Sequence, residues 1–228
     1  MRPFVESLRP LDFDFSPYRL SGTVYGTLLN DPAALAALGD AVHQAPYKAP
    51  PKAPVLYLKP RNTLSAPGAT VAVPEDTGEF EIGASLGLVI GRTASRLTES
   101  NALGHLAGVT LVADLYVPHD SFYRPSVRFR ARDGSCFVGP RVVPLAAAGD
   151  PDVIELAVSV DREQRQRVST AGMLRPAARL LADVTEFMTL FPGDLLLLGA
   201  RAGMPRARAG QRFAIEAAGI GRLEGVLE

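Results

Sequence analysis

The clearest helical pattern in this sequence is confined to residues 173–188, and it limits the folds that the chain can adopt. Apolar side chains recur there at steps of three and four residues, as one buried helix face requires: Met173, Ala177, Leu180, Leu181, Val184, Phe187 and Met188. Pro176 is compatible with this helix because it lies in the first turn. Most other regular segments are strands, and helices do not alternate with them. The sequence therefore predicts a β-rich α+β fold rather than a doubly wound sheet.

Strands are expected where short apolar runs lie between turn residues. The expected strands span residues 18–29, 55–59, 80–91, 109–114, 136–143, 153–160, 166–168, 195–198 and 212–216. Two short helices are expected at 33–42 and 99–106, with Asp31 and Thr98 as their N-caps. Residues 115–134 have no clear period and predict an ordered loop. Residues 1–20, which prolines interrupt, predict an irregular arm, and 21–228 predict one domain.

Composition and charge exclude several classes of protein. Lys and Arg together number 24, as do Asp and Glu, so the chain lacks the excess of basic charge that a nucleic-acid-binding protein needs. The single cysteine, Cys136, permits no internal disulfide. The N-terminus has no apolar run of signal-peptide length, and residues 195–198 are too short to span a bilayer. We expect a cytoplasmic protein that binds neither nucleic acid nor membrane.

Four segments, in order along the chain, resemble the fumarylacetoacetate hydrolase family: residues 57–63, 88–92, 186–194 and 210–225. Residues 44–52, 120–125 and 132–134 further resemble the N-terminal repeat of the family's isomerase/decarboxylase members. The resemblance implies a mixed β-sandwich or β-roll with a few flanking helices. It also implies frequent dimers and enolate chemistry on 2-oxo diacids.

In the family, Mg²⁺ or Mn²⁺ chelates the substrate and acts as a Lewis acid on the enolate that forms. For this chain the resemblance implies a component of 4-hydroxyphenylacetate catabolism. The two reactions that the resemblance implies for this component are decarboxylation of 5-carboxymethyl-2-oxo-hex-3-ene-1,6-dioate and isomerisation of 2-hydroxyhepta-2,4-diene-1,7-dioate.

The metal ligands of the family are two glutamates, one residue apart on a strand, and an aspartate on the next strand. Alternate strand residues face the same side, so both glutamates point at one cation. Here the glutamate positions correspond to Gly83 and Ser85, and the aspartate is retained as Asp114. Glu79 and Glu81 lie four residues earlier, about 13 Å along an extended strand. Asp114 and Glu81 are the candidate ligands of a shifted site; the alternatives are that no metal is bound and that both glutamates are solvated.

Other catalytic positions of the family are also altered. Its proton-transfer dyad corresponds to Ala34 and Ala37, and its basic-loop lysine corresponds to Arg130. Arginine keeps the charge, but a pKa above about 12 makes it a poor proton shuttle. The Gly-Thr-Pro that contacts the substrate carboxylate reads Gly199-Ala-Arg201 here, without the hydroxyl. Several parts of one site therefore differ from the family's pattern.

The remaining cationic residues suit a diacid. Arg130 and Lys59 are candidate catalytic residues because a metal-free decarboxylation needs a cationic group to stabilise the dienolate. His119 is a candidate acid–base residue. The candidate substrate-binding residues are Arg61, Tyr123, Arg124, Arg128 and Thr170. The alternative for each arginine is an ion pair with acidic neighbours such as Asp120 and Asp133.

Three interpretations follow. The first is an isomerase/decarboxylase component that acts with a separately encoded, metal-competent homologous subunit, and we expect no second repeat fused after Glu228. The second is a catalytically silent partner subunit with a degenerate metal site. The third is an autonomous hydrolase or hydratase of another 2-oxo acid. The expected assembly is either a homodimer or a heteromer with a metal-competent homologous subunit. The missing dyad argues against hydrolysis, because activating water requires a base.

Overall fold

The computed structural model describes residues 23–119, 126–139 and 141–228. The strands are β1 (Val24–Leu28), β2 (Val55–Lys59), β3 (Leu64–Ser65), β4 (Thr70–Val71), β5 (Glu79–Ile90), β6 (Leu106–Tyr116), β7 (Cys136–Val138), β8 (Glu155–Val160), β9 (Glu163–Ser169), β10 (Leu195–Leu197), β11 (Arg206–Arg208), β12 (Arg212–Ala217) and β13 (Gly221–Leu227). The α-helices are α1 (Pro32–Ala36), α2 (Glu99–Ala102), α3 (Val127–Arg130), α4 (Leu145–Ala148) and α5 (Ala177–Thr185). Short 3₁₀ turns cover Gly39–His43, Arg61–Thr63 and Leu103–His105. The β-rich α+β prediction is confirmed.

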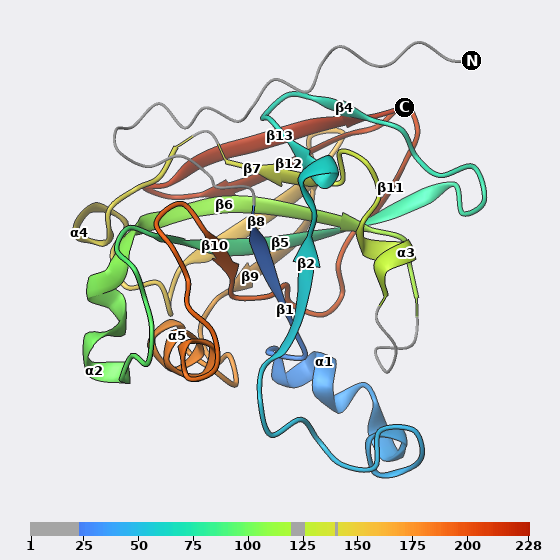
Figure 1. The fold of residues 1–228 in the computed structure, drawn as a ribbon. Helices are drawn as coiled ribbons and strands as arrows, with labels where there is room; N and C mark the ends of the chain where they lie inside the picture. The colour runs from blue at the N-terminus through green and yellow to red at the C-terminus, as the bar shows by residue number, and fades with distance from the viewer. Residues whose placement is uncertain (1–22, 120–125, 140) are drawn as a thin grey trace.

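Two sheets form the body of the molecule (Figure 1). The larger has the order β2-β1-β10-β5-β6-β7-β3, and β11 pairs with the start of β5. The smaller has the order β4-β13-β12-β8-β9. The long antiparallel pair of β5 and β6 crosses the centre of Figure 1 and places Gly83 opposite Asp114.

The larger sheet curls so that its two edge strands come close together. Strand β2 forms one edge and ends at Lys59, whereas β3 begins at Leu64 and forms the other edge. So short a connection between opposite edges requires the sheet to roll. The inner face of the roll is lined by a small apolar cluster from six strands: Val24, Leu64, Val89, Val112, Cys136, Val138, Leu195 and Leu197.

The outer face of the roll packs against the smaller sheet and α5. Alternate residues of β5 and β6, such as Leu86 and Leu111, lie in this larger core together with Val158 of β8 and Ile215 of β12. Because both faces of β5 and β6 are covered, both strands are apolar nearly throughout. No helix within the three described ranges has the length and apolar character of a membrane span.

The long helix expected at 173–188 is shorter, with α5 covering only Ala177–Thr185. The N–H groups of Leu174 and Arg175 donate to the backbone and side-chain oxygens of Asn30, so tertiary hydrogen bonds replace the predicted first turn. The N-cap predicted at Asp31 is confirmed: its carboxylate accepts from Ala33 N–H (3.3 Å). The helix that follows Asp31 ends at Ala36 and gives way to a 3₁₀ turn.

Further differences lie in the loops and the smaller sheet. Among the described residues of the region 115–134, Val127–Arg130 form a helical turn, α3, that no periodicity indicated. The helix expected at 99–106 ends at Ala102 and continues as a 3₁₀ turn. Strands β3, β4 and β11 were not expected, because each has only two or three residues. The predicted arm at 1–20 lies outside the described residues.

Candidate functional site

Asp114 lies inside the roll, at the polar end of its inner face, and is almost fully buried. Its neighbours form what we call the Asp114 cluster: Asp114, Lys59, Arg130, Tyr57 and Tyr116. Lys59 Nζ lies 2.8 Å from Asp114 Oδ1, and Arg130 Nη1 lies 3.4 Å from Oδ2. The hydroxyl of Tyr57 donates to the same Oδ2. Both carboxylate oxygens of Asp114 are therefore engaged by protein groups.

Lys59 reaches Asp114 because the sheet rolls, since β2 and β6 are not neighbours in the strand order. Its ammonium also donates to Ser135 Oγ (2.9 Å) and to the Arg130 carbonyl (2.5 Å), and it lies 3.5 Å from the Leu115 carbonyl. Three N–H groups and four surrounding oxygens satisfy this buried charge. The side chain of Lys59 is 0% exposed, so its ammonium contacts only buried protein groups and does not face solvent.

Arg130 lies between two aromatic rings. Its Cζ is 4.0 Å from the ring centroid of Tyr116 and 4.7 Å from that of Tyr57, distances at which a guanidinium is attracted by the ring faces. Burial opposes the charge of Arg130, but Tyr57, Asp114 and Tyr116 hold its pKa above the usual value. The cluster thus keeps Arg130 charged at all physiological pH values.

The two tyrosines of the cluster are strongly perturbed. Burial, followed by the charge of Asp114, raises the pKa of Tyr57 well above its usual value. Burial is also the main cause of the raised pKa of Tyr116, whose hydroxyl contacts the sulfur of Met204. Both phenols therefore remain neutral and act as hydrogen-bond donors and aromatic surfaces.

Gly83 and Ser85, the positions that the resemblance assigns to the family's glutamates, are closely packed. A Cβ built on Gly83 would lie 2.8 Å from the Asp114 carbonyl and 3.3 Å from both Tyr116 Cε1 and Ala200 Cβ. Ser85 is buried, and its hydroxyl accepts a hydrogen bond from Gly199 N–H (3.1 Å). Neither position points an oxygen at Asp114.

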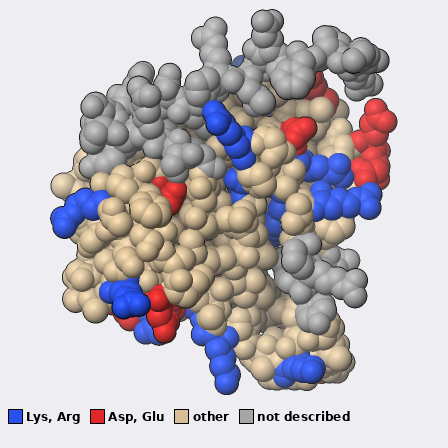
Figure 2. Space-filling model, in the orientation of Figure 1, with Lys and Arg blue, Asp and Glu red and all other residues tan. Residues whose placement is uncertain are grey.

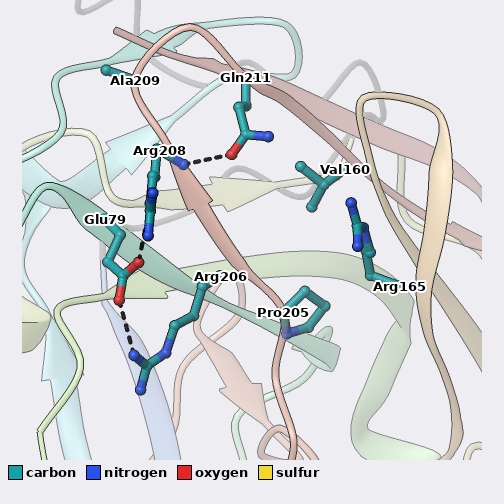
Figure 3. Close-up of a pocket in the computed structure, with 8 residues that line it drawn as sticks. All are labelled: Glu79, Val160, Arg165, Pro205, Arg206, Arg208, Ala209 and Gln211. Atoms are coloured by element: carbon teal, nitrogen blue, oxygen red, sulfur yellow. Dashed lines mark hydrogen bonds and ion pairs between the residues drawn. The ribbon is translucent and has the colours of Figure 1, made fainter.

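Glu79 and Glu81 are engaged elsewhere, by arginines of β11. Arg206 lies opposite Glu81 in the strand register and approaches it at 3.2 Å, and it also lies 2.9 Å from Glu79. Figure 3 shows Glu79 directed at Arg206 and Arg208 in a surface hollow of about 790 Å³ that Arg165 also lines. The candidate metal ligand Glu81 is therefore paired with a cation on a neighbouring strand.

A second, partly buried ion pair involves Arg201, which the resemblance assigns to the family's Gly-Thr-Pro. Arg201 Nη1 lies 2.8 Å from Asp31 Oδ1, and Ala202 N–H donates to Asp31 Oδ2 (2.7 Å). Burial alone would raise the pKa of Asp31, but these donors hold it below the usual value. Where the family has a hydroxyl for a substrate carboxylate, this chain has an internal salt bridge.

The other predicted site residues are dispersed. The His119 ring stacks on Phe129 (centroids 5.0 Å apart), and its Nδ1 lies 2.8 Å from the Val117 carbonyl. Thr170 is buried and accepts from Ile154 N–H (2.8 Å). Arg61 is exposed, whereas Tyr123 and Arg124 lie outside the described residues.

Arg128 of the basic loop is exposed and lies 3.3 Å from Asp76. Arg132 approaches the same carboxylate at 3.5 Å. Figure 2 shows a similar mixture of signs, with basic side chains beside acidic ones on the right-hand side of that face. For these two arginines the alternative of pairing with acidic neighbours describes the structure, with Asp76 as the partner. Asp120 lies outside the described residues.

Three members or neighbours of the cluster were missed from the sequence: Tyr57, Tyr116 and Ser135. A signal existed for two of them. Tyr57 lies two residues before Lys59 on β2, and Tyr116 lies two residues after Asp114 on β6, so each shares a face with a predicted site residue. Ser135 follows the basic loop, and nothing in its local sequence indicates that it approaches Lys59.

The described residues do not fit the divalent cation that the resemblance implies. Across 23–119, 126–139 and 141–228, no three His, Cys, Asp or Glu side chains come together as an ion-binding group. A divalent ion in this position would need several anionic or neutral oxygens at about 2.0–2.6 Å. The one acidic side chain in the cluster instead meets two cations and a phenol.

Comparisons with known proteins agree with this architecture. Residues 23–228 match the family described as fumarylacetoacetate hydrolase, C-terminal. The chain is 36% identical over 206 residues to a 4-hydroxyphenylacetate degradation bifunctional isomerase/decarboxylase of Escherichia coli, covering 90% of this chain and 47% of that protein. The chain therefore spans about half the length of this curated relative.

Two solved structures show the same fold. A 5-carboxymethyl-2-hydroxymuconate delta-isomerase from Mycobacterium smegmatis superposes with a TM-score of 0.75 at 26% identity, covering 91% of this chain and 79% of that one. A fumarylpyruvate hydrolase from Pseudomonas aeruginosa, solved with Mn²⁺ and pyruvate, superposes with a TM-score of 0.76 at 21% identity, covering 94% and 93%. With the match over residues 23–228, these findings show that the chain belongs to the fumarylacetoacetate hydrolase family.

Proposed function

We propose that this chain is one component of an isomerase/decarboxylase that acts on 2-oxo diacids in 4-hydroxyphenylacetate catabolism. The observation that carries the proposal is the 36% identity to the bifunctional enzyme of Escherichia coli over 90% of this chain but only 47% of that protein. The substrates would be 5-carboxymethyl-2-oxo-hex-3-ene-1,6-dioate for decarboxylation and 2-hydroxyhepta-2,4-diene-1,7-dioate for isomerisation.

The Asp114 cluster supports a division of labour within such an assembly. Asp114 is the one family metal ligand that this chain retains, and Lys59, Arg130 and Tyr57 occupy both of its oxygens. We therefore propose that a homologous subunit with the complete set of carboxylates supplies the Mg²⁺ or Mn²⁺ site. In the cytoplasm, this chain would contribute the cations Lys59 and Arg130 as catalytic groups that stabilise the negative charge of the dienolate.

The experiment compares the purified chain with its complex with a homologue that has both glutamates and the aspartate. Decarboxylation of the diacid is followed by CO₂ release, with and without a chelator. We expect no turnover by the chain alone, and chelator-sensitive turnover that is higher in the complex than in the homologue alone. Turnover by the chain alone at the rate of the complex would refute the need for a partner.

A second candidate is that this chain is catalytically silent within the assembly, which the zero exposure of the Lys59 side chain favours. Asp114→Asn in this chain alone separates the two candidates, because it alters the cluster without changing the partner. Unchanged kcat and KM in the intact complex would exclude a catalytic role for the cluster. A fall in kcat without a change in KM or in complex formation would support one.

A further inference from the structure

We infer that the guanidinium of Arg130, held between the rings of Tyr57 and Tyr116, acts with Lys59 to hold Asp114 in the roll interior in place of a divalent metal ion. The oxygen that Arg130 contacts is Asp114 Oδ2, whereas Lys59 lies 2.8 Å from Oδ1. Arg130 Nη1 and the Tyr57 hydroxyl both approach Oδ2. Both oxygens of the carboxylate therefore face a protein cation, and Oδ2 also accepts a hydrogen bond from the Tyr57 hydroxyl.

The surroundings of Arg130 match a planar cation. The two rings lie 4.0 and 4.7 Å from its Cζ, and its side chain is only 4% exposed. An aromatic face attracts guanidinium through its quadrupole and stacks against its plane, which a lysine ammonium cannot match. The tyrosine pair therefore selects arginine over the lysine that the family has at this position.

The charge of the cluster also disfavours a further cation. Lys59 and Arg130 are two positive charges beside the one carboxylate of Asp114, and all three side chains are at most 4% exposed. A divalent ion would add positive charge to a region that already has an excess and that water barely reaches. The consequence is a chain whose folding does not depend on divalent metal.

The first test uses the wild-type chain, with Mn²⁺ alone as the probe and electron paramagnetic resonance to count free ions. We expect no stoichiometric binding at millimolar Mn²⁺, and the same melting temperature with a chelator as with the metal. One bound equivalent that Asp114→Asn abolishes would overturn the inference. This measurement reads no activity, so its failure is distinct from failure of the proposed function.

The second test is chemical rescue of Arg130→Ala. The variant should lose about 10 °C in melting temperature, because it leaves Asp114 short of a buried partner. Ethylguanidinium replaces the atoms removed, and ethylurea is its neutral counterpart of similar shape. We expect ethylguanidinium to restore at least half of the loss and ethylurea to restore none, each corrected for its effect on the wild type.

Equal rescue by ethylurea would mean that the Arg130 side chain merely fills space, and the inference would be wrong. Arg130→Ala/Asp114→Asn is the matched control, in which the preference for ethylguanidinium should disappear. Arg130→Lys keeps the charge but loses the planar group, so we expect a melting temperature well below that of the wild type. A lysine variant as stable as the wild type would refute the selection of arginine by the tyrosine pair.

Discussion

Replacing Gly26 by alanine tests whether the Tyr57 ring closes the interior of the roll. Gly26 on β1 lies opposite Tyr57 on β2. A Cβ built on Gly26 would lie 2.0 Å from Tyr57 Cζ and 2.3 Å from Cε1, against an ordinary contact distance of at least 3.4 Å. The ring thus lies across the glycine, and the new methyl group would have to displace it by more than 1 Å.

The expected cost has two parts. Inserting a methyl group into a packed region destabilises by about 1–3 kcal/mol. Moving the ring also breaks the hydrogen bond from Tyr57 to the charged Asp114, which is worth about 1.5–3 kcal/mol. Gly26→Ala should therefore lower the free energy of unfolding by about 2.5–6 kcal/mol, or the melting temperature by about 10 °C.

The assay is urea unfolding followed by far-ultraviolet circular dichroism, which suits a chain without tryptophan. Tyr57→Phe removes only the hydroxyl and should cost about 1.5–3 kcal/mol. In a Tyr57→Ala background the ring is absent, so Gly26→Ala should be within about 1 kcal/mol of neutral. If Gly26→Ala is equally costly with and without the ring, the proposed contact does not explain the glycine.

Three further predictions concern the surroundings of the cluster. Asp31 has a lowered pKa in the folded chain, so its carboxylate stabilises the fold above the unfolded pKa of about 3.9, and this stabilisation is lost as pH falls through the lower folded value. The difference in melting temperature between wild type and Asp31→Asn should therefore be largest near neutral pH and should disappear in acid. Ser85→Ala leaves Gly199 N–H without its partner and should cost about 1–3 kcal/mol in urea unfolding, and a neutral result would contradict this. Burial raises the pKa of Cys136 to about 12, so iodoacetamide should alkylate it only after denaturation, as mass spectrometry can show.

Much of the fold could be predicted because its signals are local. The apolar runs around Leu86 and Leu111 predicted the central strands, and Asp31 predicted the start of α1. The ends of α5 could not be predicted, because the hydrogen bonds that replace its first turn come from Asn30, some 145 residues away. Strand β11 has only three residues and depends on its pairing with β5.

The candidate site was predictable residue by residue but not as an assembly. Lys59, Asp114 and Arg130 were each identified from the sequence, and the structure brings these three together. Their meeting depends on the rolling of a sheet in which β2 and β6 are separated by three strands. No local pattern encodes that curvature. Arg61 is exposed and lies apart from the cluster. Arg128 also lies apart from it, because an exposed loop charge can pair with a nearby acid, here Asp76.

Gly83 and Ser85 are the positions that the sequence resemblance assigns to the family's glutamates, and their close packing is physically linked to the closure of this site. With Gly83 and Ser85 in their places, the interior contains one carboxylate and two cations. Restoring a single acid, as in Ser85→Glu, would balance these charges but would leave both oxygens of Asp114 engaged by Lys59, Arg130 and Tyr57. A glutamate at Gly83 would also meet the Asp114 carbonyl and the Tyr116 ring. One substitution is therefore not enough to create a metal site here. Acidic side chains are needed at both Gly83 and Ser85, and Arg130 or the tyrosines that hold it must also be replaced.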